Sequence, residues 1–376
     1  LASDGSCTVK ATNNLSNRRL TINGDMRIAQ RSTAAVNDDS YRTVDRFSMT
    51  YSGTDNHPTQ ERHALTSSDT GPWEKGFRYS YHITNADQTS GAGASDYIRI
   101  GHAIEAQDIA NSGWNYTSAS SYITFQFWIK SSVAQSFKVE FYAHDGTAQG
   151  FSFDTGSLSA NTWTKVTKTI PGNSNLTFDN DSGEGLHIRL FAFQGTDKTD
   201  NSVTEDAWAA FSGSARTKDM ASTWYTTNNA TLEITGVQLE VGDYPSSFEF
   251  KLYGDELLRC QRYFYMHVSG DEGSVDTNYT PIGIGYYDTA SHFYTHVFYG
   301  TTMRTNPDLY KVEDTGYWNI RDTSSSETCN SVQVSRLNTR GAVLLFTGNV
   351  AGTQHAGSMV RTHNVAAVRL GFDAEL

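Results

Sequence analysis

Residues 123–130, ITFQFWIK, decide the fold class of this chain. Each odd-numbered position holds a large apolar residue, and the even-numbered positions hold Thr, Gln, Trp and Lys. Successive side chains of a strand point to opposite faces of its sheet, so this alternation predicts a strand with one buried and one polar face.

The same period of two recurs through the first 250 residues, for example in residues 137–141 (FKVEF) and 188–192 (IRLFA). In residues 232–241, LEITGVQLEV, the apolar positions are even before Gly236 and odd after it. One extra residue in a strand reverses the face of every later side chain, so we predict a β-bulge at Gly236. Together these strands predict a β-sandwich.

Composition supports an all-β protein and excludes several classes. The 376 residues include 29 Lys and Arg against 41 Asp and Glu, a formal net charge of −12, whereas nucleic-acid binders carry a basic footprint. Aromatic residues make up 12% and there are only 6 Pro, unlike a disordered chain. The longest apolar run, residues 342–346, is far shorter than the roughly 20 residues that span a bilayer. We therefore expect neither a nucleic-acid partner nor membrane insertion.

Helix signals are few, and one of them marks a change of domain. Residues 103–110 have the composition of a short helix, and residues 255–264 (DELLRCQRYF) have acids first, bases later and leucines at helical spacing. Long exposed loops are expected at 52–72, 86–96 and 194–222. The predicted domains are a lead-in over 1–17, a sandwich over 18–250 and a smaller all-β domain over 251–376, joined by the short helix. Strands of the last domain are predicted at Tyr263–Val268, Ile282–Tyr286, Phe293–Phe298, Tyr317–Ile320, Val332–Val334, Val343–Phe346 and Val365–Phe372.

The three cysteines, Cys7, Cys260 and Cys329, lie too far apart in sequence for a zinc ribbon or a dense disulfide framework, so we expect small hydrophobic side chains. The chain opens at Leu1 without Met and without an apolar signal region, which is consistent with a longer or processed parent chain.

The sequence contains no motif for catalysis: no G-x-S-x-G elbow, no H-E-x-x-H helix and no P-loop. The densest group of acids and histidines is Glu140 with His144 and Asp145, which we place on the surface. We predict no catalytic residue, although spacing in sequence does not test carboxylates that only the fold brings together. Residues 179–184, DNDSGE, loosely resemble a calcium loop through Asp179 and Asp181, but they lack its full spacing and read better as a solvated turn.

Aromatic residues in polar loops are the second chemical signal, because sugars stack on exposed rings. Five such rings lie in Gly-, Ser-, Thr- and Asn-rich surroundings and are the candidate glycan-binding residues: Trp73, Trp114, Tyr116, Trp224 and Tyr225. On this hypothesis, alanine at Trp114 and Tyr116, or at Trp224 and Tyr225, weakens adsorption to host cells without unfolding the protein.

Several segments together resemble virion proteins of tailed bacteriophages, in particular tail fibres. These are residues 20–31 (LTINGDMRIAQR) with 44–47 (VDRF); residues 77–81, 104–105 and 125–132; and residues 234–242 (ITGVQLEVG) with 248–249 and 256–263. Residues 303–307 (MRTNP) and 370–376 (LGFDAEL) are similar to the closing domain of such proteins. The resemblance implies a jelly roll similar to carbohydrate-binding modules, a location in the virion after assembly in the host cytoplasm, and partners among other virion proteins.

The resemblance also implies a non-enzymatic role in host attachment, with host surface polysaccharide as a partner. Two alternatives stay open: a polysaccharide-degrading tailspike, and a carbohydrate-binding module of a cellular enzyme. Related jelly rolls often hold a structural calcium through an Asp in the last strand, but Thr235 occupies that position, so half of the expected carboxylate cage is missing. No cofactor is expected.

Homotrimerisation follows from the resemblance to fibres and from the aromatic residues of the last 120 positions. A small domain has limited core, so some of these rings would face neighbouring subunits: Tyr263, Phe264, Tyr286, Tyr287, Phe293, Tyr294 and Phe298. The alternative is a monomeric sandwich with aromatic strands.

Overall fold

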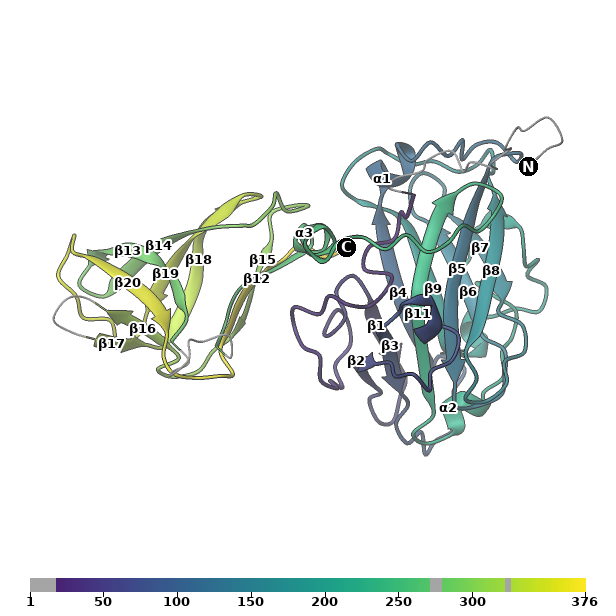
Figure 1. Ribbon diagram of the computed structural model, residues 1–376, viewed down its shortest axis with the longest axis horizontal. Helices are drawn as coiled ribbons and strands as arrows, with labels where there is room; N and C mark the ends of the chain where they lie inside the picture. Colours follow the sequence, from purple (N-terminus) through teal and green to yellow (C-terminus); the bar gives the residue numbers. More distant parts are fainter. Residues whose placement is uncertain (1–17, 271–278, 322–325) are drawn as a thin grey trace. The chain divides into compact units, whose positions relative to one another are not determined.

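The computed structural model describes residues 18–270, 279–321 and 326–376 and divides the chain into two units. Unit 1 comprises residues 1–252 with Leu376, and unit 2 comprises Tyr253–Glu375. In both units, most of the regular secondary structure consists of antiparallel strands (Figure 1). Within the described residues, no helix is long and apolar enough to cross a bilayer.

Unit 1 is a jelly-roll β-sandwich of two antiparallel sheets. The five-stranded sheet has the order β2-β3-β11-β5-β8, and the six-stranded sheet has the order β1-β4-β9-β6-β7-β10. The elements of unit 1 are β1 (Ser48–Ser52), β2 (Thr59–Ala64), η1 (Trp73–Lys75), β3 (Tyr79–Thr84), β4 (Tyr97–Glu105), α1 (Ala106–Ala110), β5 (Tyr122–Ser131), β6 (Lys138–Ala143), β7 (Gln149–Asp154), β8 (Thr164–Pro171), β9 (Glu184–Gln194), η2 (Thr196–Lys198), β10 (Trp208–Ala210), α2 (Thr223–Thr226) and β11 (Thr231–Val241).

The core of unit 1 lies between its sheets and follows the predicted alternation. Phe125 and Phe127 of β5 pack inward, and Val139 and Phe141 of β6 meet them from the other sheet. The bulge is also confirmed, since the pairing of β11 with β5 shifts between Thr235 and Gln238 and Gly236 has φ +64°. The residues on either side of the bulge therefore keep their apolar side chains in the core.

The polar segment near residues 20–47 has a structural role. The Asn23 side-chain amide donates to the carbonyl oxygens of Ile28 and Asp45, and the Ile28 N–H donates back to Asn23 Oδ1. Asp45 Oδ1 accepts from the Gln30 N–H at 2.9 Å. These side chains supply the hydrogen bonds of a segment without regular strands, as buried backbone groups require.

Unit 2 begins with α3 (Tyr253–Gln261), which confirms the predicted helix. A three-stranded sheet has the order β12-β21-β15, and a seven-stranded sheet has the order β17-β16-β20-β13-β14-β19-β18. Their core includes the fully buried Trp318 and Phe346. The strands are β12 (Phe264–Ser269), β13 (Pro281–Thr289), β14 (His292–Phe298), β15 (Asp308–Val312), β16 (Trp318–Arg321), β17 (Ser326–Cys329), β18 (Ser331–Asn338), β19 (Gly341–Thr347), β20 (Gly357–Thr362) and β21 (Arg369–Asp373).

Some element boundaries differ from the sequence-based expectations. Residues 103–105 end β4, so only 106–110 of the predicted helix is helical. The loop predicted at 52–72 contains β2, and the loop predicted at 194–222 contains η2 and β10. The last predicted strand begins at Arg369, not Val365. Cys260 and Cys329 are buried as expected, and Cys7 and the lead-in 1–17 lie outside the described residues.

Candidate functional site

The outer face of the five-stranded sheet carries the polar half of the alternation. On β5 it presents Gln126, Trp128 and Lys130, and on β11 it presents Glu233 and Thr235. Trp128 pairs with Lys165 of β8 on one side and with Thr235 on the other. An aromatic ring therefore lies in the middle of a sheet face whose other side chains can hydrogen-bond.

The bulge at Gly236 makes room for two rings on this face. A Cβ atom at Gly236 would lie 2.8 Å from Phe77 Cζ and 3.1 Å from Trp128 Cδ1. The opposite end of the indole meets Gly71, where a Cβ would lie 2.8 Å from Trp128 Cζ3. Both glycines let Trp128 lie against the backbone, and its side chain remains only half-buried.

Asp69 fixes the loop between β2 and β3 onto this face. Its Oδ1 accepts from Lys130 Nζ at 2.9 Å and from the Trp163 indole at 3.0 Å, and Lys130 also contacts Glu233 at 2.8 Å. Burial raises the pKa of Asp69, but the hydrogen bonds from the Thr66 N–H, Trp163 and Lys130, together with the Lys130 charge, hold it well below its usual range. Asp69 therefore stays ionised and keeps the loop in place.

A second segment, residues 245–250, crosses the other side of the face. The buried Glu240 carboxylate accepts from the Ser246 N–H at 2.8 Å and from the Ser246 hydroxyl. Gln126 Nε2 donates to the Ser246 carbonyl at 2.7 Å, and the Glu249 N–H donates to Gln238 Oε1 at 2.8 Å. The polar residues of the 234–242 segment thus anchor a wall above the sheet.

Between the loop and this wall lies a groove of ≈ 410 Å³, which we call the Trp128 groove. Its described lining comprises Lys75, Phe77, Gln126, Trp128, Lys165, Gly236, Pro245, Ser246, Ser247, Phe248 and Phe250. Phe77, Phe248 and Phe250 pack edge to face or tilted, with ring centroids 4.8–5.1 Å apart. Such a volume suits a small ligand, with apolar rings for contact and a few polar groups for orientation.

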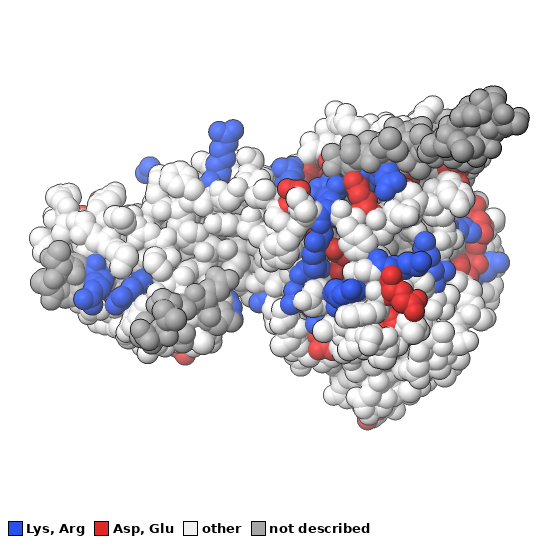
Figure 2. Space-filling model, viewed as in Figure 1, with Lys and Arg blue, Asp and Glu red and all other residues white. Residues whose placement is uncertain are grey.

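The charge of the groove is opposite to that of the chain. Its lining residues include two lysines and no Asp or Glu, although the whole chain carries −12. Burial lowers the pKa of Lys165; Glu240 raises it, and Lys75 lowers it further. Figure 2 shows Lys and Arg side chains gathered on the face of unit 1 seen there, with Asp and Glu among them.

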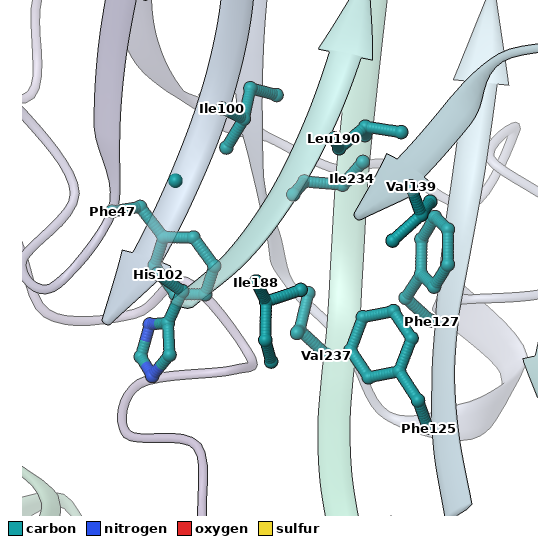
Figure 3. A pocket seen from close by; sticks show the side chains of 11 residues that line it. Phe47, Ile100, His102, Phe125, Phe127, Val139, Ile188, Leu190, Ile234 and Val237 are labelled. Carbon is teal, nitrogen blue, oxygen red and sulfur yellow. The ribbon is translucent and has the colours of Figure 1, made fainter. Parts of the chain in front are cut away.

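A second cavity lies inside the sandwich and is not a candidate. Its lining side chains come from both sheets, including Ile188, Leu190, Phe125 and Phe127 (Figure 3). Its volume is ≈ 20 Å³, about that of one water, and its walls are almost wholly apolar. This cavity is a packing gap in the core.

Of the five predicted glycan-binding rings, three are buried, and Tyr116 and Trp73 are half-buried. Trp114 is 3% exposed, and its indole donates to the Ser121 carbonyl. Tyr116 is half-buried and packs edge to face on Phe178 at 4.9 Å. Trp114 and Tyr116 do lie together, but they belong to the edge of the core.

Trp224 and Tyr225 form part of α2 and are also buried, at 0% and 1% exposed. The Trp224 indole donates to the Thr231 carbonyl, and the Tyr225 hydroxyl donates to Asp96. The expectation that these rings are exposed is therefore wrong, because each ring closes an end of the sandwich and finds a hydrogen-bond partner there. Trp73 is half-buried beneath the Arg78 guanidinium, 3.8 Å from the ring centroid.

The rings that do lie on the candidate face, Trp128 and Trp163, were not among the predicted residues. One signal could have found Trp128, since it occupies a polar-face position in an otherwise clean alternation. Trp163 immediately precedes β8, and its indole donates a hydrogen bond to Asp69.

The weak calcium candidates do not form a cage in the structure. Asp179 and Asp181 are exposed, and Asp181 Oδ1 accepts from the Gly183 N–H at 2.8 Å, as in a solvated turn. Thr235 is buried, and its hydroxyl donates to the Tyr79 carbonyl. Neither Asp belongs to a group of three potential metal ligands among the residues described.

The predicted surface position of Glu140 is wrong. Glu140 is fully buried and contacts Arg189 at 3.1 Å. Burial raises its pKa, and the charges of Arg189, Arg216 and Arg99 offset only part of that rise. The loop after β10 covers this side of the six-stranded sheet, with Phe211 packed on Tyr142 at 4.5 Å. Glu140 thus forms a buried ion pair.

In unit 2 the seven rings proposed to face other subunits divide into buried and exposed groups, with Tyr294 half-buried and stacked on Tyr286. Tyr263, Phe264, Tyr287 and Phe293 are buried in their own domain. Tyr286 and Phe298 are 50% and 71% exposed, and Ile284 beside them is 80% exposed. We call Ile284, Tyr286 and Phe298 the β13–β14 patch.

No family model matches the sequence, and no curated protein matches it. Solved structures similar to the chain include the enzymatically active domain of tailspike protein 4 of bacteriophage CBA120, with TM-score 0.33 and 11% identity over 60% of this chain. That match spans 21% of the tailspike chain.

Two others are a putative sugar binding protein from Bacteroides thetaiotaomicron and the N-terminal cellulose-binding domain of β-1,4-glucanase C from Cellulomonas fimi. The first has TM-score 0.30 and 9% identity, and the match covers 60% of this chain and all 100% of that one. The second has TM-score 0.28 and 7% identity, with 57% and 97% covered. At such low similarity, the binding chemistry of this chain depends on its own side chains.

Proposed function

We propose that the protein is a non-enzymatic, glycan-binding component of a phage virion, and that the Trp128 groove holds the glycan. The observation that carries the glycan assignment is the groove itself: a half-buried indole in an open sheet face, flanked by phenylalanines, an amide and two lysines. A tail fibre or another surface appendage used for host attachment fits this role.

A saccharide suits this combination of groups. The C–H faces of a sugar ring are apolar and pack on an aromatic ring, while its hydroxyls need hydrogen-bond partners at the edge. Trp128 supplies the ring, and Gln126, Ser246, Ser247 and the lysines lie beside it. Lys75 and Lys165 favour a glycan that carries carboxylate or phosphate groups, since no acid among the described lining residues repels it.

The same lining supports binding without hydrolysis. Glycosidases place two carboxyl groups on either side of the bond they cut. The described lining of the Trp128 groove has none, and the nearby Glu240 is buried under Ser246. Glycan cleavage in this groove would lack both its acid and its nucleophile.

An array of purified bacterial capsular polysaccharides and O-antigens tests the binding proposal. Wild-type protein and a Trp73→Ala control should be retained by the same glycans, and Trp128→Ala should lose them. Lys165→Gln, which changes an exposed side chain, should weaken retention by acidic glycans only. Equal retention of Trp128→Ala and wild type would place recognition elsewhere.

Incubation with each retained polysaccharide tests the non-enzymatic part. We expect no new reducing ends over background. Release of reducing ends that a single Asp or Glu substitution abolishes would instead identify a polysaccharide-degrading tailspike.

The virion assignment rests on the sequence resemblance to tail fibres, and self-association is supported by the β13–β14 patch. Exposed apolar side chains grouped on one sheet are typical of an interaction surface. We propose that copies of this chain form a homotrimer through this patch, alongside contacts with other virion proteins. Peptides of the chain in purified phage particles, and their absence from host cells without phage, would support the location.

A further inference from the structure

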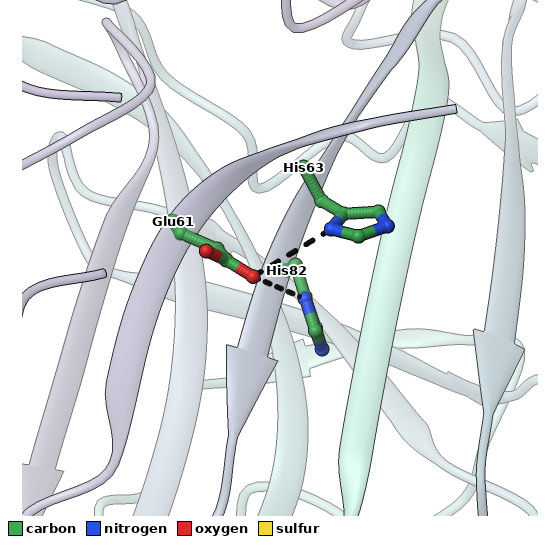
Figure 4. A group of neighbouring side chains, drawn as sticks. All are labelled: Glu61, His63 and His82. Carbon is green, nitrogen blue, oxygen red and sulfur yellow. Dashed lines mark hydrogen bonds and ion pairs between the residues drawn. The ribbon is translucent and has the colours of Figure 1, made fainter. Parts of the chain in front are cut away.

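Apart from the Trp128 groove, a cluster of three potential metal ligands lies on strands β2 and β3. We call Glu61, His63 and His82 the His63 cluster (Figure 4). Glu61 is directly opposite His82 in the antiparallel register, and His63 is two residues further along β2, so all three side chains share one face. The strand geometry alone therefore brings them together.

The side chains converge on one carboxylate oxygen. Glu61 Oε1 lies 2.8 Å from His82 Nδ1 and 3.6 Å from His63 Nδ1. The two imidazole rings meet edge to face at a centroid distance of 5.2 Å. Figure 4 shows both nitrogens directed at the same oxygen from different sides.

These separations are close to those between the ligands of a bound zinc ion. A tetrahedral Zn²⁺ with bonds of about 2.1 Å keeps its ligand atoms about 3.4 Å apart. The two distances to Glu61 Oε1 lie on either side of that value, and all three ligand atoms lie within 4.8 Å of one another. Small rotations of the three side chains would place an ion between their ligand atoms.

The donor set also selects the kind of ion. Two imidazole nitrogens and one carboxylate oxygen suit Zn²⁺ and its neighbours in the first transition row, whereas Ca²⁺ takes six to eight oxygens. The side chains are 30%, 45% and 13% exposed for Glu61, His63 and His82. A fourth, water-filled position is therefore open to solvent.

We infer that the His63 cluster binds one Zn²⁺ ion through Glu61, His63 and His82, with solvent as the fourth ligand. The ion would join β2, the edge strand of the five-stranded sheet, to β3. It replaces the hydrogen bond between Glu61 and His82 with three metal–ligand bonds. His82 Nε2 lies 3.5 Å from Thr84 Oγ1, a group that can orient the ring from behind. This site is separate from glycan binding and does not depend on it.

Calorimetric titration of the full chain, without a polyhistidine tag, with Zn²⁺ tests the inference. We expect one equivalent to bind, and Glu61→Gln and His82→Gln to weaken that binding at least ~10-fold each. His57→Gln, an exposed histidine outside the cluster, should bind like wild type. Cobalt(II) should give the intense visible absorption of a tetrahedral site in wild type and lose it in His82→Gln.

Circular dichroism of each variant separates loss of a ligand from loss of the fold, and Zn²⁺ should raise the unfolding temperature of wild type but not of Glu61→Gln. The inference is overturned if wild type binds no Zn²⁺. It also fails if folded Glu61→Gln and His82→Gln bind as tightly as wild type, or if Ca²⁺ displaces the zinc at equal concentration.

Discussion

His187 is a buried histidine that makes the stability of unit 1 depend on pH. Burial lowers its pKa; the Glu184 carboxylate, 3.1 Å away, opposes this, while Arg189 and Arg99 lower it further, to about 4. The folded state therefore holds His187 neutral, while the unfolded chain titrates near 6.5. His102, also fully buried, has its pKa lowered in the same way.

Because the folded pKa lies below the unfolded one, stability is fully present above about pH 6.5 and falls as pH decreases toward 4. His187 alone accounts for a loss of ~3 kcal/mol across that window. Urea unfolding between pH 7 and pH 4 should reveal the loss, and His187→Gln should reduce it. If His187→Gln loses stability with pH as wild type does, His187 is not the cause of the loss.

Trp224 is a core residue, so its removal should affect stability before binding. The side chain is 0% exposed, and Trp224→Ala should lower the free energy of unfolding by about 3–5 kcal/mol. Trp73→Ala, at a half-buried position, should lower the free energy of unfolding by clearly less. Chemical denaturation with fluorescence detection measures both, and a cost below about 1 kcal/mol for Trp224→Ala would contradict the packing described.

The sequence could not predict which individual aromatic side chains of the site are exposed. Polar neighbours suggested that Trp224 and Tyr225 were exposed, but Asn, Ser and Thr also surround rings that close the end of a sandwich. Burial there depends on contacts distant in sequence, such as Tyr225 with Asp96 and Phe193. The one sign that distinguished Trp128 was its position on the polar side of the alternation in β5.

Gly236 belongs both to the β-bulge of β11 and to the lining of the Trp128 groove. Its φ is +64°, and a Cβ there would lie 2.8 Å from Phe77. Gly91 has φ +80° with open space around it, which makes it a matched control for backbone strain alone. Gly91→Ala should lower the free energy of unfolding by about 1 kcal/mol. Gly236→Ala should lower it clearly more, because the new methyl group also displaces the Phe77 ring. Equal costs in thermal unfolding would show that the Phe77 contact does not matter.

Strands with a clean period of two in sequence, such as β5 and β6, were predictable because every second residue is apolar and faces the core. In unit 2, the strands β15, β17 and β20 escaped prediction. β15 and β17 are short and expose much of both faces, whereas β20 buries one face through Ser358, Val360 and Thr362, of which only Val360 is strongly apolar. Their pairing in unit 2 comes from neighbours far along the chain, for example β15 with β21. The sequence pattern carries no such partner information.

At the scale of the whole molecule, self-association should depend on the β13–β14 patch. Light scattering should give three times the chain mass of 41.5 kDa, and Phe298→Lys combined with Ile284→Lys should shift the mass toward one chain. Leu258→Lys, at a 49% exposed position of α3 outside the patch, should leave the mass unchanged. A monomer mass for wild type at micromolar concentration would reject the trimer.

In the proposed glycan site, Trp128 is the ring that holds the sugar. Calorimetric titration of wild type and Trp128→Ala with a polysaccharide fragment retained on the array tests this directly, once equal secondary structure and cooperative unfolding establish that both are folded. An aromatic anchor enclosed by its ligand contributes about 2 kcal/mol or more, so Trp128→Ala should weaken binding at least ~30-fold. Equal affinities of the two folded proteins would contradict this role of Trp128.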